Sequence, residues 1–249
     1  MRAFQFTKMQ GLGNDFVVLE GPREFADEEI AAICDRRFGI GADGILVVTR
    51  DDPVSMGYWN ADGTIAEMCG NGLRCVARYA YDRGWAPDRN FVVLTAVGER
   101  GVRILEDGVE AELGRPRLNG SLKVDGAEYH LVDVGNPHAV TFVDDPAMAD
   151  VEVVGKRIQS EFEDGTNVEF ARVVDGGLEL RVWERGVGET LACGTGMVAA
   201  AAVAAEQHNL RGPFRVDVRG GTATVDLRDG VAWIRGPAGY SFRGSVGER

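Results

Sequence analysis

Two cysteines in matching surroundings are the residues of this sequence best suited to chemistry. Cys69 and Cys193 each begin a Cys-Gly-x-Gly turn, and each turn leads directly into a run with helical periodicity. A cysteine at a helix N-terminus lies in a positive field among backbone N–H groups, which favours the thiolate and can lower the thiol pKa below about 8.5. A thiolate of this kind can remove a proton from a carbon acid, so the pair suggests acid–base chemistry.

The two turns belong to an internal repeat. The stretches 58–72 and 182–196 contain these cysteines and superpose with a single offset of 124 residues and no gap. A second pair of similar stretches, 12–18 and 134–140, lies upstream at nearly the same separation. Two short motifs in the same order and at similar spacing indicate an internal duplication with one turn in each half.

A pair of turns related by pseudo-symmetry suggests a specific mechanism. Two sulfur atoms on opposite sides of one bound molecule could act together, one thiolate removing a proton and the opposite thiol delivering one to the other face. The glycines allow backbone N–H groups to approach an anion such as an α-carboxylate. The sequence therefore favours inversion at a carbon atom without a cofactor.

The bulk properties exclude several other classes. The chain has 249 residues, of which 45% are hydrophobic, enough for two domains with their own cores. Its net charge of −12 argues against a nucleic-acid or anionic-membrane partner. No apolar run is long enough to span a bilayer and the N-terminus has no secretion segment, so we expect a cytoplasmic protein without a membrane partner.

Neither a metal nor a bound cofactor is expected. The four cysteines are too scattered for a disulfide scaffold, and no His or Cys spacing is typical of a metal site. We interpret Cys34 and Cys75 as buried packing residues. The few lysines lie outside any phosphate-binding context, so pyridoxal phosphate is not expected.

Apolar alternation predicts strands in both halves of the chain. We expect strands at residues 4–6, 16–19, 44–49, 56–60, 91–96, 101–105, 109–113, 128–134, 138–143, 167–174, 178–183, 214–219, 222–227 and 231–235. Asp-Gly or Asn-Gly pairs beginning at 62, 107, 119, 125, 164, 175 and 229 indicate tight turns between antiparallel strands.

Helices are expected after Asp27, around 151–158 and after each cysteine turn. Residues 197–205 are apolar all round, so the helix after Cys193 must be buried on every side. The helix after Cys69 is expected to have one apolar face, with Arg74 and Arg78 outside that face. The prediction is an α+β fold of two pseudo-symmetric domains, each a curved, mostly antiparallel sheet around a central helix, with the active site in the cleft between them. We place the domains at 1–115, with 237–249 returning to the first, and at 116–236.

The sequence also resembles the diaminopimelate epimerase family. The resemblance is carried by MQGLGNDF at 9–16, RFGIGADG at 37–44, NADG at 60–63, MCGNGLRC at 68–75, GNPH at 135–138 and ERGVGETLACGTG at 184–196. It spans both halves and nearly the whole chain. It implies a cofactor-independent isomerase that interconverts LL- and meso-2,6-diaminopimelate for lysine and peptidoglycan precursor synthesis, commonly as a homodimer.

The resemblance also implies the roles of individual residues. Cys69 and Cys193 would be the catalytic pair, with Cys193 the proton acceptor and Cys69 the donor in the LL-to-meso direction. His138 and the Glu184 side chain would tune the cysteines. The reacting carboxylate would be held by the backbone N–H groups of Gly70, Asn71, Gly194 and Thr195. The rest of the substrate would be bound by Asn14, Asn60, Asn136, Asn167, Arg185 and the Glu184 backbone.

Two positions qualify the resemblance. Gly44 stands where many family members carry glutamine, so a side-chain contact expected there is absent. Arg185 gives the second carboxylate of diaminopimelate a bidentate partner, which a proline racemase would not need.

Three other functions remain open at the level of sequence. They are a two-cysteine racemase of proline, hydroxyproline or histidine, a thiol–disulfide oxidoreductase that uses Cys69 and Cys193, and a non-catalytic amino-acid-binding protein. Substrate turnover separates the first, dithiol dependence the second, and the effect of cysteine-to-serine changes on turnover and binding the third.

Overall fold

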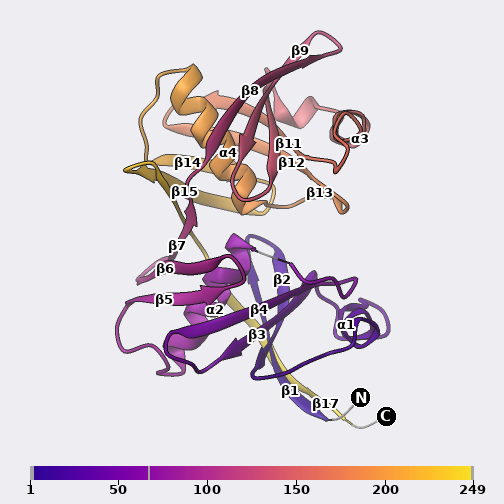
Figure 1. Ribbon diagram of the computed structural model, residues 1–249, viewed down its shortest axis with the longest axis vertical. Coiled ribbons are helices and arrows are strands. Elements are labelled where there is room, and N and C mark those ends of the chain that lie inside the picture. Colours follow the sequence, from indigo (N-terminus) through magenta and orange to yellow (C-terminus); the bar gives the residue numbers. More distant parts are fainter. Residues whose placement is uncertain (1–2, 67, 248–249) are drawn as a thin grey trace. The chain divides into compact units, whose positions relative to one another are not determined.

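The computed structural model describes residues 3–66 and 68–247, which fold into two compact units (Figure 1). Unit 1 comprises Met1–Ala111 and Gly236–Arg249, and unit 2 comprises Glu112–Arg235. Each unit has its own set of paired strands and its own core and is described by itself below.

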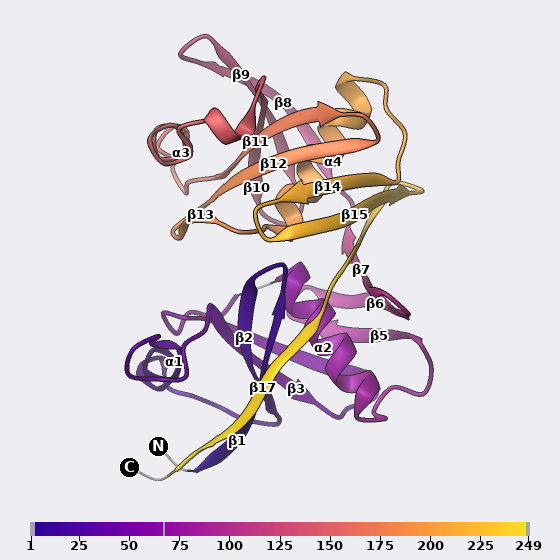
Figure 2. The same cartoon turned by 180° about the vertical axis from the view of Figure 1, so that it is seen from behind.

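Unit 1 is a curved sheet around one long helix. Its elements are β1 (Phe4–Gly11), β2 (Asn14–Glu20), α1 (Asp27–Cys34), β3 (Gly44–Thr49), β4 (Val54–Asn60), α2 (Gly70–Asp82), β5 (Asn90–Thr95), β6 (Gly98–Leu105), β7 (Gly108–Gly114) and β17 (Gly239–Val246). The strands follow one another in the sheet as β17, β1, β2, β3, β4, β5, β6 and β7. The last strand, β17, runs antiparallel along β1 (Figure 2).

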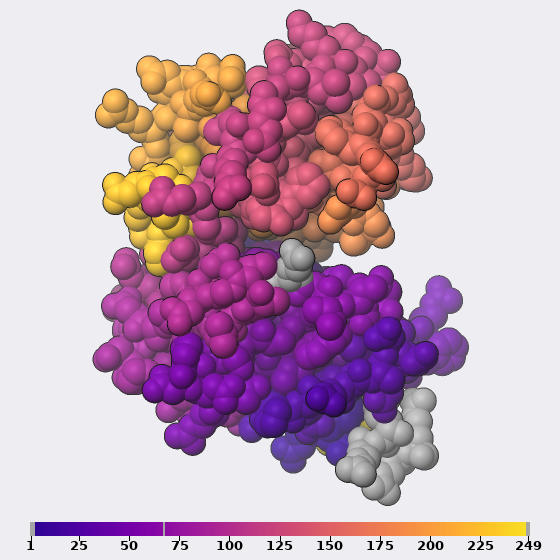
Figure 3. Space-filling model, viewed as in Figure 1, coloured from indigo at the N-terminus to yellow at the C-terminus, as the bar shows by residue number. Residues whose placement is uncertain are grey.

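Unit 2 has the same plan. Its elements are β8 (Arg117–Val124), β9 (Ala127–Asp133), β10 (Pro137–Phe142), the 3-10 turn η1 (Pro146–Met148), α3 (Val151–Gln159), β11 (Asn167–Val174), β12 (Gly177–Glu184), β13 (Gly188–Thr190), α4 (Gly194–Gln207), β14 (Phe214–Val218), β15 (Gly221–Arg228) and β16 (Val231–Gly236). The hairpin of β8 and β9 covers much of the face of unit 2 seen in Figure 3.

The strand pairings show that the two units repeat one topology. In unit 1 the parallel pairs are β2–β3, joined through α1, and β4–β5, joined through α2. In unit 2 they are β10–β11, joined through α3, and β12–β14, joined through α4. The neighbouring strands β17–β1, β1–β2, β3–β4, β5–β6 and β6–β7 of unit 1 are antiparallel. So are β8–β9, β9–β10, β11–β12, β12–β13, β14–β15 and β15–β16 of unit 2. The internal duplication inferred from the cysteine motifs therefore extends to the order and direction of the strands.

The central helices are buried because of their composition. Every residue of α4 from Gly194 to Ala204 is buried, and small alanine side chains allow strands β9, β10, β11, β12 and β15 to pack closely around it. Helix α2 packs against β1, β2, β3, β4 and β6 in the same way. The predicted α+β class with two pseudo-symmetric halves, each a mostly antiparallel sheet around a helix, is confirmed.

Two expectations from the sequence are wrong in detail. Asn119 and Gly120 do not form a turn but lie inside β8, where the register shifts between Leu118 and Ser121 and Gly120 takes a φ of 85°. The pair is thus a β-bulge, which uses the same positive φ as a turn. Arg74, expected off the buried face of its helix, is 0% exposed because backbone carbonyls surround its guanidinium.

Candidate active site

Both cysteines cap their helices, as the sequence predicts. Cys69 is the N-cap of α2 and Cys193 the N-cap of α4, each in an extended conformation. The first intrahelical bond runs from Leu73 N to Cys69 O at 2.8 Å in one unit and from Met197 N to Cys193 O at 3.0 Å in the other. The N–H groups before these bonds have no acceptor within the helix and form a potential anion site at each helix start.

The two sulfur atoms meet the helix start differently. In unit 1, Gly72 N donates to Cys69 Sγ at 3.3 Å, which favours the thiolate. In unit 2 the Cys193 side chain accepts no capping hydrogen bond from its helix, and its sulfur lies 3.4 Å from Thr195 Oγ1. The N–H of Gly196, which is equivalent to Gly72 under the offset of 124, still acts to lower the Cys193 pKa.

Asn14 links Cys69 to the first turn of α2. Its Oδ1 accepts from Cys69 Sγ at 3.4 Å and from Asn71 Nδ2 at 3.3 Å, while its Nδ2 donates to Asp43 Oδ2 at 2.8 Å. Because Asp43 can only accept when ionised, it fixes the orientation of the Asn14 amide with the oxygen toward the thiol. Asp43 lies in the RFGIGADG motif at 37–44, but no role for it was expected from the sequence.

A charged cluster supports this amide. Arg36 donates to Asp15 Oδ1 and to Asp43 Oδ1, both at 2.7 Å, and Lys8 donates to Asp15 Oδ2 at 2.5 Å. Burial alone would raise the pKa of Asp15, but the hydrogen bonds and charges of Arg36 and Lys8 outweigh it and lower the pKa to about 2. Asp15 is therefore ionised under ordinary conditions and holds the loop that carries Asn14.

Arg74 lies behind the first turn of α2. Its guanidinium donates to Asn71 Oδ1 at 2.7 Å and to the backbone oxygens of Gly70 and Pro237, each at 3.3 Å. These bonds tie residues 70–71, which were expected to hold the substrate carboxylate, to the returning C-terminal segment. Local sequence patterns could not indicate this contact, since the partner Pro237 lies 163 residues away.

His138 and Glu169 form a buried pair in unit 2. His138 Nδ1 lies 2.7 Å from Glu169 Oε1, both side chains are 0% exposed, and His138 Nε2 lies 3.0 Å from Asn136 Oδ1. Asn136 occupies the place in unit 2 that Asn14 occupies in unit 1, yet it contacts the histidine. Glu169 was not among the residues expected in the site.

Glu184 lies close enough to the Cys193 thiol for each to influence the pKa of the other. Its carboxyl accepts a hydrogen bond from the Thr190 hydroxyl, and the Cys193 side chain is a second donor that acts on its pKa. Burial raises the pKa of Glu184 above its usual value, against the effect of these two donors. A carboxyl of this kind can accept the thiol proton and return it.

The expectation that the helix terminus lowers the thiol pKa is wrong for Cys193. Burial raises its pKa well above the ordinary value, and the charges of Glu184 and Glu169 add to the effect. The opposing hydrogen bonds come from the Thr195 hydroxyl, 3.4 Å from the sulfur, and from the Gly196 N–H. Two neighbouring carboxyls and a desolvated sulfur thus outweigh the helix start.

Asn167 and Arg185 are joined to each other. Asn167 is buried; its Oδ1 accepts from Arg185 N at 3.0 Å and its Nδ2 donates to Pro137 O at 2.9 Å. The exposed Arg185 side chain donates through Nη1 to Asp164 O at 3.0 Å. Asn167 therefore holds the loop that presents Arg185, and the guanidinium has further donors to offer.

Asn60 and Gly44 lie on neighbouring strands of unit 1. Asn60 ends β4 and donates through Nδ2 to Thr64 Oγ1 at 3.0 Å. A Cβ at Gly44 would lie 2.4 Å from Trp59 O and 2.8 Å from Tyr58 Cε2, so no side chain fits there without moving β4. The glycine that departs from the family's frequent glutamine is thus required by the packing of this sheet.

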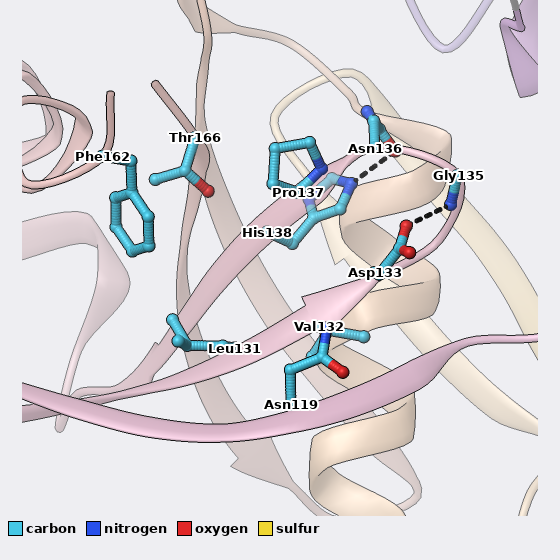
Figure 4. Close-up of a pocket in the computed structure, with 10 residues that line it drawn as sticks. All are labelled: Asn119, Leu131, Val132, Asp133, Gly135, Asn136, Pro137, His138, Phe162 and Thr166. Carbon is cyan, nitrogen blue, oxygen red and sulfur yellow. Dashed lines mark hydrogen bonds between the residues drawn. The ribbon is translucent and has the colours of Figure 1, made fainter. Parts of the chain in front are cut away.

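A pocket of about 370 Å³ opens in unit 2 beside the His138–Asn136 contact (Figure 4). Asn136 and His138 line it, together with Asn119, Leu131, Val132, Asp133, Gly135, Pro137, Phe162 and Thr166. The Cys193 thiol is not part of its wall. The pocket therefore gives solvent access to the Asn136 end of the histidine pair rather than to the sulfur.

Over residues 3–66 and 68–247, no group of three or more His, Cys, Asp or Glu side chains could hold a metal ion, and no helix is long and apolar enough to cross a membrane. Cys34 and Cys75 are buried, and burial raises their pKa to about 11 and about 12.

Several solved structures have this fold. The chain is similar to a PhzF-family phenazine biosynthesis protein of Bacillus anthracis, with a TM-score of 0.76 and 14% identity over 99% of both chains. It is equally similar to a hydroxyproline epimerase from Agrobacterium vitis, with a TM-score of 0.76 and 16% identity over 98% of this chain and 92% of the other. The protein is therefore a two-domain α+β protein of the fold that these structures share.

Sequence comparison narrows this class to one family. The model described as diaminopimelate epimerase matches residues 6–119 and 130–239. A diaminopimelate epimerase of Alkalilimnicola ehrlichii is 41% identical, with 97% of this chain and 98% of the relative covered. The chain belongs to the diaminopimelate epimerase family and is thus an isomerase.

Proposed function

We propose that the protein interconverts LL- and meso-2,6-diaminopimelate by proton transfer between Cys69 and Cys193, in the supply of lysine and peptidoglycan precursors. The observation that carries this proposal is the repeated helix start: each of two homologous units presents one cysteine as the N-cap of its central helix. Two equivalent acid–base groups suit a reaction that removes a proton from one face of a carbon and adds one to the other.

In the LL-to-meso direction, Cys193 acts as the base. Its thiolate takes the α-proton, so that a C–H bond breaks and an S–H bond forms, and Cys69 then delivers its thiol proton to the opposite face of the carbanion. The Cys193 thiol must first lose its own proton, and the nearby Glu184 carboxyl is the group that accepts it. The two steps leave Cys193 protonated and Cys69 ionised, ready for the reverse direction.

The helix starts supply the electrostatic stabilisation. We assign the α-carboxylate to the backbone N–H groups of Gly70, Asn71, Gly194 and Thr195. Charge that develops on the carboxylate as the α-proton leaves is then met by donors that are already oriented. Arg74 contributes by fixing the first turn of α2.

The other polar residues bind the ends of the substrate. We assign Asn14, Asn60, Asn136, Asn167, the Glu184 backbone and the Arg185 guanidinium to this role, with Arg185 on the distal carboxylate. The His138 and Glu184 side chains set the charge around the cysteines. A homodimer and a cytoplasmic location are part of the same proposal.

The test is turnover of LL-diaminopimelate in deuterated buffer with a reductant and no added cofactor. We expect the meso isomer to form with deuterium at the α-carbon, and Cys69→Ser and Cys193→Ser to abolish it, whereas Cys34→Ala remains active. Proline, hydroxyproline and histidine serve as alternative substrates in the same assay. Rapid racemisation of one of these without turnover of diaminopimelate would refute the substrate assignment, and dithiol oxidation without epimerisation would refute the reaction.

A further inference from the structure

Unit 2 contains a buried carboxyl, Glu169, that the mechanism above does not use. It lies in β11, where Val168 and Phe170 belong to the apolar cluster that includes residues of α3. Alternation along the strand therefore directs Glu169 to the opposite face, toward α4. A Cβ built on Gly196 would lie 2.5 Å from Glu169 Oε1, so the carboxyl is packed against the helix start that Cys193 caps.

The surroundings of Glu169 call for a positive charge. The residue is 0% exposed, and its Oε2 has no hydrogen-bond partner within residues 3–66 and 68–247. A carboxylate in such a place is unfavourable unless a cation or oriented dipoles compensate it. The N-terminus of α4 supplies part of that compensation, and the His138 ring, bound to Oε1 at 2.7 Å, can supply the rest.

The other side of the ring indicates its charge. His138 Nε2 lies 3.0 Å from Asn136 Oδ1, so both ring nitrogens face oxygen acceptors. With Glu169 ionised, only the imidazolium donates to both oxygens, because a neutral ring would then carry its proton on Nδ1 and would require the Asn136 amide to be reversed. The charge on the ring and the orientation of the amide are therefore coupled.

We propose that Glu169 is a positioning residue that holds His138 as an imidazolium and thereby sets the orientation of the Asn136 amide. With the ring protonated, Asn136 keeps its oxygen on the histidine and presents its NH₂ group to an acceptor on the substrate. This use of the amide rests on the proposed function, but the charge of the ring does not.

The direct test is the protonation state of His138 in the ligand-free protein. We expect ¹⁵N NMR of histidine-labelled protein at neutral pH to show both His138 nitrogens protonated, and Glu169→Gln, which keeps the side-chain shape, to give a neutral ring. His130 and His208, the other two histidines, should be unchanged. Glu179→Gln is the matched control, because that carboxyl lies on the neighbouring strand and is paired with Arg172.

The result that overturns the proposal is a neutral His138 in the unchanged protein, or an imidazolium that persists in Glu169→Gln. The first of these outcomes needs no variant, so the test stands even if Glu169→Gln fails to fold. The ring charge is read without substrate. Absence of epimerisation by the unchanged protein would therefore defeat the proposed function alone.

Kinetics test whether Glu169 acts through His138. Loss of a buried hydrogen bond to a charged group should lower kcat/KM about 10- to 100-fold in Glu169→Gln. In a His138→Gln background the same change should cost less than about threefold, because the partner is already gone. An equal loss in both backgrounds would show that Glu169 does not act through the ring.

Discussion

Gly196→Ala tests the packing between Glu169 and the start of α4. The new Cβ would lie 2.5 Å from Glu169 Oε1 and 3.2 Å from its Cγ and Cδ, whereas ordinary contact begins at 3.4 Å. The carboxyl must then retreat by about 0.9 Å, and a movement of this size along the 2.7 Å bond to His138 would break it. Replacing one glycine should therefore disconnect the buried pair.

The expected cost follows from two opposing terms. Loss of a buried hydrogen bond to a charged group costs about 1.5–3 kcal/mol, and replacing glycine by alanine in a helix returns up to about 1 kcal/mol. The net loss of unfolding free energy is then between about 0.5 and 3 kcal/mol. Gly72→Ala, at the equivalent position of α2, is the matched control: its Cβ would meet only the flexible ends of Leu46 and Met56 at 3.1 and 3.3 Å and Cys69 Cβ at 3.5 Å.

Urea unfolding of both variants measures the difference, and ¹⁵N NMR reports the His138 ring. We expect Gly196→Ala to be the less stable variant and its extra cost to disappear in a Glu169→Ala background, where the clash is absent. Equal stability of the two glycine variants with an unchanged His138 signal would refute the reasoning, because the carboxyl would then have room to move without losing its partner.

Four further outcomes follow from the same structure. The folded-state pKa of Glu184 lies above 4.5, so the native state loses stability as the pH rises from that value; Glu184→Gln should remove this slope, and an unchanged slope in pH-dependent unfolding would contradict it. The effect of Asp15 on stability has the opposite pH dependence, because its stabilisation is present above pH 3.8 and lost toward about pH 2. Asp15→Asn should therefore lower the free energy of unfolding by about 2 kcal/mol at neutral pH and by little at pH 2. Alkylation at about pH 8 followed by mass spectrometry should modify the partly exposed Cys69 and spare Cys34 and Cys75, because a thiol with a pKa near 11 or 12 is scarcely ionised there. Gly44→Gln should lower the free energy of unfolding, measured by urea denaturation, by about 1–3 kcal/mol, since its Cβ would clash with the β4 backbone. An unchanged free energy of unfolding would show that the strand can shift at little cost.

The sequence was most informative where local pattern and burial agree. Strands 44–49 and 167–174 were predicted with the bounds that the structure has, because apolar runs between turn residues allow few alternatives. The apolar helix after Cys193 and the cysteine caps were also predictable, since both depend on neighbouring residues. Strand β8 was not predicted: most of its residues are polar and exposed, and pairing with β9 rather than its own periodicity makes it a strand.

The charged residues of the interior could not be predicted from the sequence. Arg74 is buried because Gly70, Asn71 and the distant Pro237 offer oxygens to its guanidinium. Glu169 stands in a strand whose apolar residues predict its position but not its partner, His138, 31 residues earlier. The raised pKa of Cys193 likewise depends on two carboxyls that only the fold brings to the helix start.

The two-base mechanism is tested most directly by where solvent deuterium appears early in the reaction of LL-diaminopimelate. Two cysteines on opposite faces predict that the meso product carries one deuterium at the inverted carbon while the remaining LL substrate stays unlabelled. A single base that serves both faces would return deuterium to the substrate as well. Equal early labelling of recovered LL substrate and meso product would contradict the assignment of Cys193 and Cys69 as separate proton acceptor and donor.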